Sequence, residues 1–291
     1  MLKTLSLVAI AMFAFAANSL LCRMALSNPT IDPVSFTSLR IVSGAVALLL
    51  LSFFSRRKQP QRHYTENLWQ DVKRNASVFG GLSLFVYAIS FSFAYISMST
   101  GTGALLLFGA VQLTMISVGL MGGERFKIRQ WFGFALAFTG LIILLLPSAS
   151  APSLLSGAVM VIAGISWGIY SLLGKKSASA LLSTSGNFIY ASLLCILMMG
   201  TVLLLNDEYL VLNKAGIYYA LASGILASGC GYAIWYSVLP LIKSTSAATV
   251  QLSVPVIATM MGWTVLEEQL NLQIIIASLA TLGGIYLVIK K

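Results

Sequence analysis

The chain has 291 residues, of which 58% are hydrophobic and only 9% are charged, and its mean hydropathy is +0.90. A soluble domain carries roughly 25% charged residues, so this composition excludes a soluble enzyme. It also excludes intrinsic disorder, and three cysteines with 24 scattered glycines exclude a disulfide framework and a collagen-like repeat. The remaining class is a polytopic membrane protein.

The apolar residues fall into ten segments, and each is long enough for a membrane-spanning helix, which needs roughly 20 apolar residues. Consecutive apolar runs such as 48–51 lack the alternation of a transmembrane β-barrel, so the segments are predicted to be helices. The predicted helices cover residues 4–22, 34–54, 76–98, 102–121, 129–146, 154–173, 184–205, 215–239, 246–266 and 271–289.

The net charge of +10 is carried by the connections between these segments. Lys and Arg gather in every second connection and at both ends of the chain, whereas the other connections hold only Arg23 and Lys214. Under the positive-inside rule this bias predicts cytoplasmic termini and a bacterial-type inner membrane, and it explains the basic residues without a nucleic-acid partner.

The two halves of the chain align with each other at an offset of 144 residues. The alignment indicates two copies of one unit, residues 1–147 and 148–291. Five helices per copy require the second copy to enter the membrane inverted, which is typical of secondary transporters. The matched pairs are Phe91 with Trp235, Ala104 with Ala248, Glu124 with Glu268, and Gly140 with Gly284.

Charges beside the matched acidic residues agree with inversion. Arg125 directly follows Glu124, with two further bases close behind, whereas no base follows Glu268 before Lys290. The first motif is therefore expected inside the cell and the second outside.

The two halves contain short motifs: Ser35-Phe36 through Arg40, Glu124-Arg125, Pro255-Val256, Gly262-Trp263 and Glu268. With these motifs the chain resembles, over its whole length, the drug/metabolite transporter superfamily and within it the two-domain EamA type. The resemblance implies a carrier, with export of amino acids or related metabolites. One departure is Val111, which stands where the family often has the proline matched by Pro255.

Polar residues inside the spans are the candidate substrate-binding residues, because each costs energy there unless it lines a cavity or has a partner. Arg40 lies roughly 10 Å into its helix at 1.5 Å per residue. It is expected either to meet a solute carboxylate, or to bond helix-end carbonyls or extend its charged end toward the membrane surface, and Asn187 is its counterpart with the same alternatives. Asn18, Gln112 and Gln251 are expected either to line the cavity or to form interhelical hydrogen bonds.

Aromatic residues at mid-span are expected to form the cavity wall, although packing is the alternative for each. Pro255, one turn after Gln251, is a predicted hinge because it frees a backbone carbonyl. Two Gly-x-x-x-Gly spacings, Gly164 with Gly168 and Gly119 with Gly123, predict close helix packing. The wall residues are Tyr87, Trp167, Tyr170 and Trp235.

No acidic residue lies deep in any predicted span, so coupling to a proton on a buried carboxylate is disfavoured. Glu124 and Glu268 are expected to cap the helices that follow them. His63 has no cluster of ligands around it, and Lys176 stands where a P-loop needs Ser or Thr, so neither a metal nor a nucleotide cofactor is expected.

The sequence thus predicts an all-α protein of ten transmembrane helices in two inverted repeats. It predicts a monomeric or homodimeric carrier, not an enzyme, whose partners are a small neutral or zwitterionic solute and the lipid bilayer. The alternatives are a membrane-embedded lipid-modifying enzyme, which would need buried acid or histidine pairs, and a non-transporting scaffold.

Overall fold

The structure is a computed structural model that describes residues 2–28, 30–58, 67–123, 125–146, 152–174, 177, 179–205, 210–238, 241 and 250–289. Throughout these residues the fold is helical, apart from connections and an isolated bridge between Ile31 and Leu212. In the part of the chain so described, eight helices are long and apolar enough to cross a membrane, and two shorter apolar helices accompany them.

The helices coincide with the predicted apolar segments to within a few residues at most ends. Helix α12 starts later than predicted, and residues 242–249 before it lie outside the described chain. One short helix, α3, was not predicted, because it lies in a polar connection. The helices are α1 (Leu2–Ser27), α2 (Pro33–Lys58), α3 (Leu68–Asn75), α4 (Val78–Tyr95), α5 (Thr100–Met121), α6 (Ile128–Leu145), α7 (Leu154–Gly174), α8 (Ala180–Leu205), α9 (Lys214–Ala222), the π-helical η2 (Ser223–Cys230), α10 (Gly231–Val238), α12 (Ser253–Leu266) and α13 (Leu272–Ile289).

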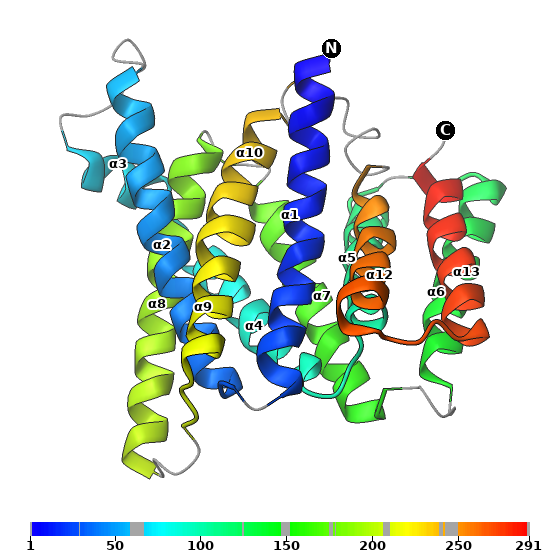
Figure 1. Ribbon diagram of the computed structural model, residues 1–291. Coiled ribbons are helices and arrows are strands. Elements are labelled where there is room, and N and C mark those ends of the chain that lie inside the picture. Colours follow the sequence, from blue (N-terminus) through cyan, green and yellow to red (C-terminus); the bar gives the residue numbers. More distant parts are fainter. Residues whose placement is uncertain are drawn as a thin grey trace.

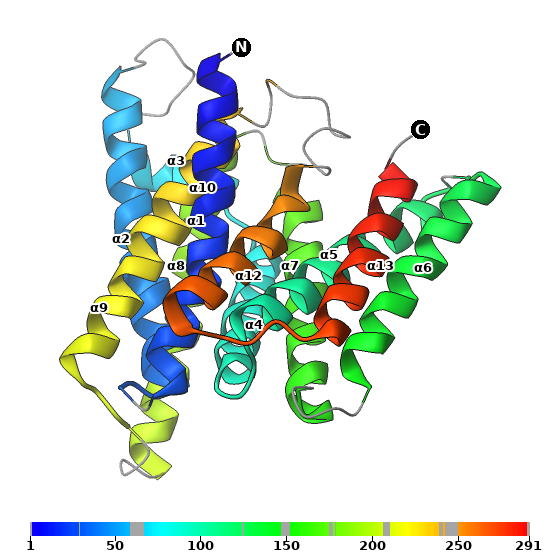
Figure 2. The same ribbon diagram turned by 45° about the vertical axis from the view of Figure 1, so that its right-hand side comes forward.

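Helix packing follows a pattern that repeats between the two halves of the chain. Helix α7 packs on α4 and α5, while α1 packs on η2, α10 and α12. Helix α2 packs on α8, and α6 packs on α13 at one edge of the bundle, away from α1 and α2 (Figures 1 and 2). Each contact has a counterpart in the other half, if α9, η2 and α10 are counted as one helix. Replacing every helix of the first half by the helix at the same place in the second half, and the reverse, gives the same set of contacts.

Small residues let the helices at two of these contacts approach closely. A Cβ atom on Gly133 would meet the carbonyl of Gly284 at 2.7 Å, where α6 crosses α13. On α7, a Cβ on Gly164 would meet the carbonyl of Leu107 at 2.7 Å, which confirms the close packing predicted there. The prediction was wrong for Gly123. It has φ +94° and no atom within 4 Å of its Cβ position, so it ends α5 in a left-handed conformation instead of packing on a helix.

The two ends of the bundle differ in what they carry. Both termini and α3 lie at one end, and the α12–α13 connection lies at the other (Figure 1). At the first end, the buried Asp71 of α3 pairs with Arg56 of α2 at 3.6 Å. At the second end, the Asp32 carboxylate accepts hydrogen bonds from the backbone of Ser35 at 2.8 Å and of Val211 at 3.0 Å, which ties two connections together.

Candidate functional site

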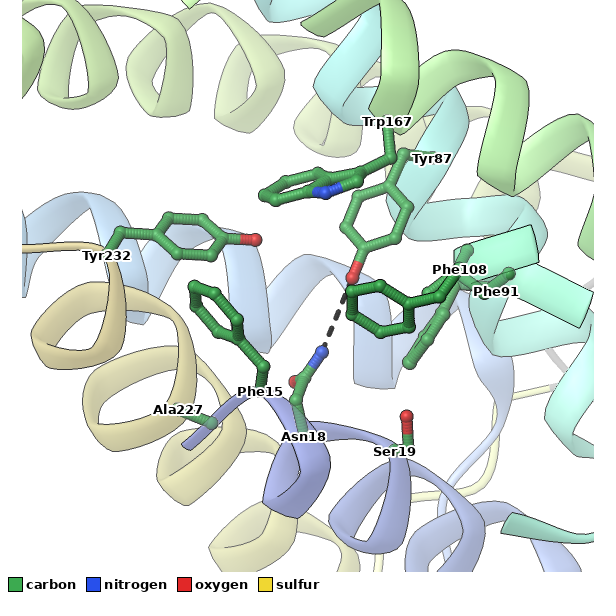
Figure 3. A pocket seen from close by; sticks show the side chains of 10 residues that line it. Phe15, Asn18, Ser19, Tyr87, Phe91, Phe108, Trp167, Ala227 and Tyr232 are labelled. Atoms are coloured by element: carbon green, nitrogen blue, oxygen red, sulfur yellow. Dashed lines mark hydrogen bonds between the residues drawn. The ribbon is translucent and has the colours of Figure 1, made fainter. Parts of the chain in front are cut away.

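A small cavity lies between α1, α4, α5, α7, η2 and α10 (Figure 3). Its volume is about 20 Å³, which is room for about one water molecule. Helix α12 contributes no lining residue. The lining residues are Phe15, Asn18, Ser19, Tyr87, Phe91, Leu107, Phe108, Trp167, Ala227 and Tyr232.

Three of the predicted binding residues, Asn18, Tyr87 and Trp167, meet in this cavity. The indole of Trp167 lies with its centre 4.8 Å from the Tyr87 ring and 5.1 Å from the Tyr232 ring. Aromatic rings at these separations attract each other beyond their burial. The rings come from α4, α7 and α10, so the cavity wall joins both halves of the chain.

Two further predicted aromatics lie directly behind this wall. The buried Tyr170 has its ring centre 5.3 Å from that of Trp167, one turn along α7. Trp235 has its ring centre 6.1 Å from Phe15, at an edge-to-face angle of 69°. Both support the lining rings but are absent from the lining itself.

A chain of hydrogen bonds runs past the cavity and links four helical segments. The Arg40 guanidinium donates through Nη2 to the Tyr87 hydroxyl oxygen at 3.0 Å. The Asn18 amide donates to the same oxygen at 3.4 Å, as Figure 3 shows, and its Oδ1 accepts from the Ser223 hydroxyl at 2.6 Å. The chain therefore crosses α2, α4, α1 and η2.

Arg40 lies behind Tyr87 and does not line the cavity. It is 1% exposed, and its guanidinium carbon lies 5.3 Å from the centre of the Tyr87 ring and 5.0 Å from that of Phe91. Among the described residues, its Nε and Nη1 atoms have no hydrogen-bond partner. A buried cation here touches aromatic faces and a hydroxyl, but no carboxylate.

The π-helical segment η2 places Ser223 against Asn18. Single π-helical turns are frequent at functional sites because they rotate the side chains that follow. Gly224 lets this segment lie on α2, since a Cβ on it would overlap the Ser43 hydroxyl and the Arg40 carbonyl. Only a residue without a side chain permits this approach.

The other four predicted site residues lie away from the cavity lining. Gln112 is buried in α5, one turn beyond the lining residue Phe108. The buried Asn187 accepts a hydrogen bond from the backbone of Ser77 at 2.8 Å, which ties α8 to the start of α4. Gln251 lies two residues before α12, and Pro255 lies in the first turn of that helix, where the missing N–H of a proline costs little.

A second polar cluster lies at the end of the bundle where α12 meets α13. The Glu268 carboxylate accepts hydrogen bonds from the backbone N–H of Thr100 at 2.8 and 2.9 Å, and from its hydroxyl at 3.1 Å. Arg23 of α1 lies 3.6 Å from Glu268 and donates to the carbonyls of Tyr95 and Ile96. This contact ties α1, α5 and the α12–α13 connection together.

The prediction that Glu268 caps its own helix was wrong. Asn271 occupies that role, because its side chain accepts from the backbone of Ile274 at 2.8 Å. Glu268 instead caps the N-terminus of α5, whose positive end favours a carboxylate. Glu124, for which the same role was predicted, lies outside the described residues, as does His63.

Sequence reasoning missed seven of the ten residues that line the cavity. Most of the missed residues are apolar or small, so they resemble residues that face lipid. Ser223 had a signal, because it is a polar residue inside the predicted apolar segment 215–239. In the described part of the chain, no three His, Cys, Asp or Glu side chains are grouped to hold a metal ion. The missed residues are Phe15, Ser19, Phe91, Leu107, Phe108, Ala227 and Tyr232 in the lining, and Ser223 beside it.

Comparison with known proteins identifies a family that the chain matches. The model of the EamA-like transporter family matches residues 2–146 and again residues 155–290. An uncharacterized protein of Pseudomonas aeruginosa is 47% identical over 99% of this chain and 94% of its own length. A Salmonella typhimurium protein named "Probable amino-acid metabolite efflux pump" is 24% identical over 72% of both chains. A solved crystal structure shares the fold, with a TM-score of 0.62, 16% identity, and 97% of this chain and 96% of that chain covered.

Proposed function

The chain belongs to the EamA-like transporter family and is a multi-pass membrane protein, and on that premise we propose that it carries a small neutral or zwitterionic metabolite by alternating access. The observation that carries this proposal is the small cavity between the halves of the chain, with aromatic walls and one line of polar groups. Aromatic faces and a few placed polar groups are typical of small-molecule sites.

Amino acids or related metabolites are the proposed cargo, and export is the proposed direction. The name of the Salmonella typhimurium relative supports this choice, although that protein is distant. The cavity agrees with a cargo of low charge, because none of its lining side chains is ionised and a single base, Arg40, donates to the lining residue Tyr87. Binding requires the rings to part, since the cavity is too small for an amino acid.

Two inverted repeats of five spanning helices are the proposed basis of alternating access. The exchange symmetry of the helix contacts and the two matches to the family model support this arrangement. The cluster of Arg23, Thr100 and Glu268 closes one end of the bundle between the repeats. Opening of the cavity toward that end would break it.

The end that carries this cluster is proposed to face the outside of an inner membrane, with both termini in the cytoplasm. The test uses one cysteine at a time and an impermeant thiol reagent applied to intact cells. A cysteine at the exposed Gln269, beside the cluster, is expected to react, and one at the exposed Trp69 on α3 is expected to stay protected. The opposite pattern, or labelling of both, would overturn the inverted topology.

The proposed function is tested by flux from proteoliposomes that hold the purified full chain. The vesicles are loaded with the twenty standard amino acids, and each amino acid that leaves is measured against protein-free vesicles. Release of at least one amino acid by the wild type, reduced in Trp167→Ala, is the expected result. Release of none would refute the amino-acid cargo, and a lipid-modifying enzyme or a scaffold would show no flux of any metabolite.

A further inference from the structure

The hydrogen bonds at Tyr87 leave its hydroxyl hydrogen unused. A phenol oxygen accepts through its lone pairs and donates one hydrogen. Here the oxygen accepts from Arg40 at 3.0 Å and from Asn18 at 3.4 Å. Since the guanidinium has no acceptor atom, the direction of the first bond is fixed. In the described chain, no side chain or backbone oxygen accepts the Tyr87 hydrogen.

The hydrogen bond of Asn18 with its other partner, Ser223, fixes which atom of the Asn18 amide faces Tyr87. Its Oδ1 accepts the Ser223 hydroxyl at 2.6 Å, which turns its Nδ2 toward Tyr87 and the cavity (Figure 3). An amide nitrogen carries two hydrogens, and the bond to Tyr87 uses one of them. At this wall of the cavity, Tyr87 and Asn18 therefore present donors.

The charge behind this wall is positive and has no compensating acid. Arg40 is fully buried, two of its nitrogens lack partners, and no acidic residue pairs with it among the described residues. A buried charge without a counter-charge is costly. A ligand that brings an anionic acceptor to the Tyr87 hydroxyl would reduce that cost.

We propose that the Tyr87–Asn18 wall binds the carboxylate of the solute, with Arg40 behind it as the positioning residue that holds Tyr87 as a donor. This inference rests on the proposed function and narrows its cargo from neutral or zwitterionic metabolites to those that bear a single carboxylate. A phosphate group is a poorer match, because it brings up to two charges to one buried base. The rings of Trp167 and Tyr232 then face the remainder of the solute.

The experiment measures binding to the purified full chain as a rise in its thermal unfolding midpoint. Three series of probes are used: the twenty standard amino acids, their carboxamides, and the carboxylic acids that lack the amino group. The carboxamides keep the shape and lose the anion. In the wild type, amino acids that bind are expected to bind at least about 10-fold more tightly than their carboxamides, since a hydrogen bond to a charged group contributes about 10- to 100-fold.

Three variants distinguish recognition of the carboxylate from the fit of the solute against the aromatic wall. Tyr87→Phe keeps the ring and removes the donor, and Arg40→Met removes the charge, so both are expected to abolish most of the preference for acid over amide. Trp167→Phe is the matched control in the same cavity, because it trims an aromatic wall without touching the polar chain. It is expected to weaken acid and amide by the same factor.

Several results would overturn the inference. Equal binding of acid and amide by the wild type would do so, as would a preference that survives in both Tyr87→Phe and Arg40→Met. If no amino acid binds but the acids without an amino group do, the amino-acid cargo of the proposed function fails while the carboxylate site stands. If neither series binds, the carboxylate site is refuted as well.

Discussion

Two arginines of the first two helices have opposite surroundings. Arg23 lies at one end of the bundle, where its side chain is 22% exposed and pairs with Glu268. Arg40 lies in the interior, 1% exposed, with a tyrosine hydroxyl and two aromatic rings in place of a carboxylate. Among the described residues, a carboxylate therefore pairs with the more exposed arginine and none pairs with the buried one.

This difference separates a structural role from a binding role. A pair at the end of the bundle closes a contact between helices of the two halves, so its carboxylate has to be part of the chain. A buried guanidinium without an acid is expensive unless function requires it, which makes its missing partner informative. The three predictions below test the two regions against each other, with the largest expected effect first.

Gly224→Ala is expected to cause the largest loss of stability, because the added methyl would overlap the Arg40 carbonyl and force η2 away from α2. Overpacking of this kind costs about 1–3 kcal/mol in the free energy of unfolding. Gly200→Ala on α8 is the control, since no atom lies within 4 Å of its Cβ position. It should leave stability unchanged or raise it by up to about 1 kcal/mol. Unfolding in mixed micelles measures both, and equal losses would contradict the close contact of η2 with α2.

Glu268→Ala removes the acceptor of the Thr100 backbone and the partner of Arg23, and is expected to cost about 1–3 kcal/mol in the free energy of unfolding. Glu267→Ala changes an exposed carboxylate in the same connection and should leave the unfolding midpoint close to that of the wild type. The same unfolding assay compares them. A loss of equal size in both variants would show that net charge, and not the contact with α5, is what matters there.

Arg23→Met and Arg40→Met carry the same substitution into the two regions and test the comparison itself. The first removes the ion-pair partner of Glu268 and the side-chain donor to two backbone carbonyls, and is expected to cost about 1–2 kcal/mol in the free energy of unfolding. The second removes a buried charge that has no acid, and is expected to change that free energy by less than about 1 kcal/mol. If Arg40→Met proved the more destabilising, Arg40 would be a structural residue.

The spanning helices could be predicted from sequence because a long apolar run has few alternatives to a helix. Helix α3 could not, since eight residues in a polar connection give no such signal. Its start depends on Asn67, whose side chain accepts from the backbone of Trp69 at 3.0 Å. The partner of Glu268 could not be predicted from sequence either, because an acidic residue can cap any helix whose N-terminus tertiary packing places beside it.

The candidate site was predictable where a polar or large aromatic residue interrupts an apolar span, as at Asn18, Tyr87 and Trp167. It was not predictable at Phe15, because Phe13 is the same residue two positions earlier and is 57% exposed. These helices are apolar on all sides, so periodicity does not distinguish the face toward lipid from the face toward the cavity. The π-helical turn that turns Ser223 toward Asn18 has no reliable sequence pattern either.

The most direct test of the carboxylate site is an experimental structure of the chain with the amino acid that gives the largest rise in its unfolding midpoint. Its carboxylate oxygen is predicted to lie about 2.5–3.0 Å from the Tyr87 hydroxyl oxygen, which is the range of a hydrogen bond from O–H. Arg40 should still donate to the opposite side of that hydroxyl. A carboxylate bound elsewhere, with the amino group or the side chain of the solute at Tyr87, would contradict the account.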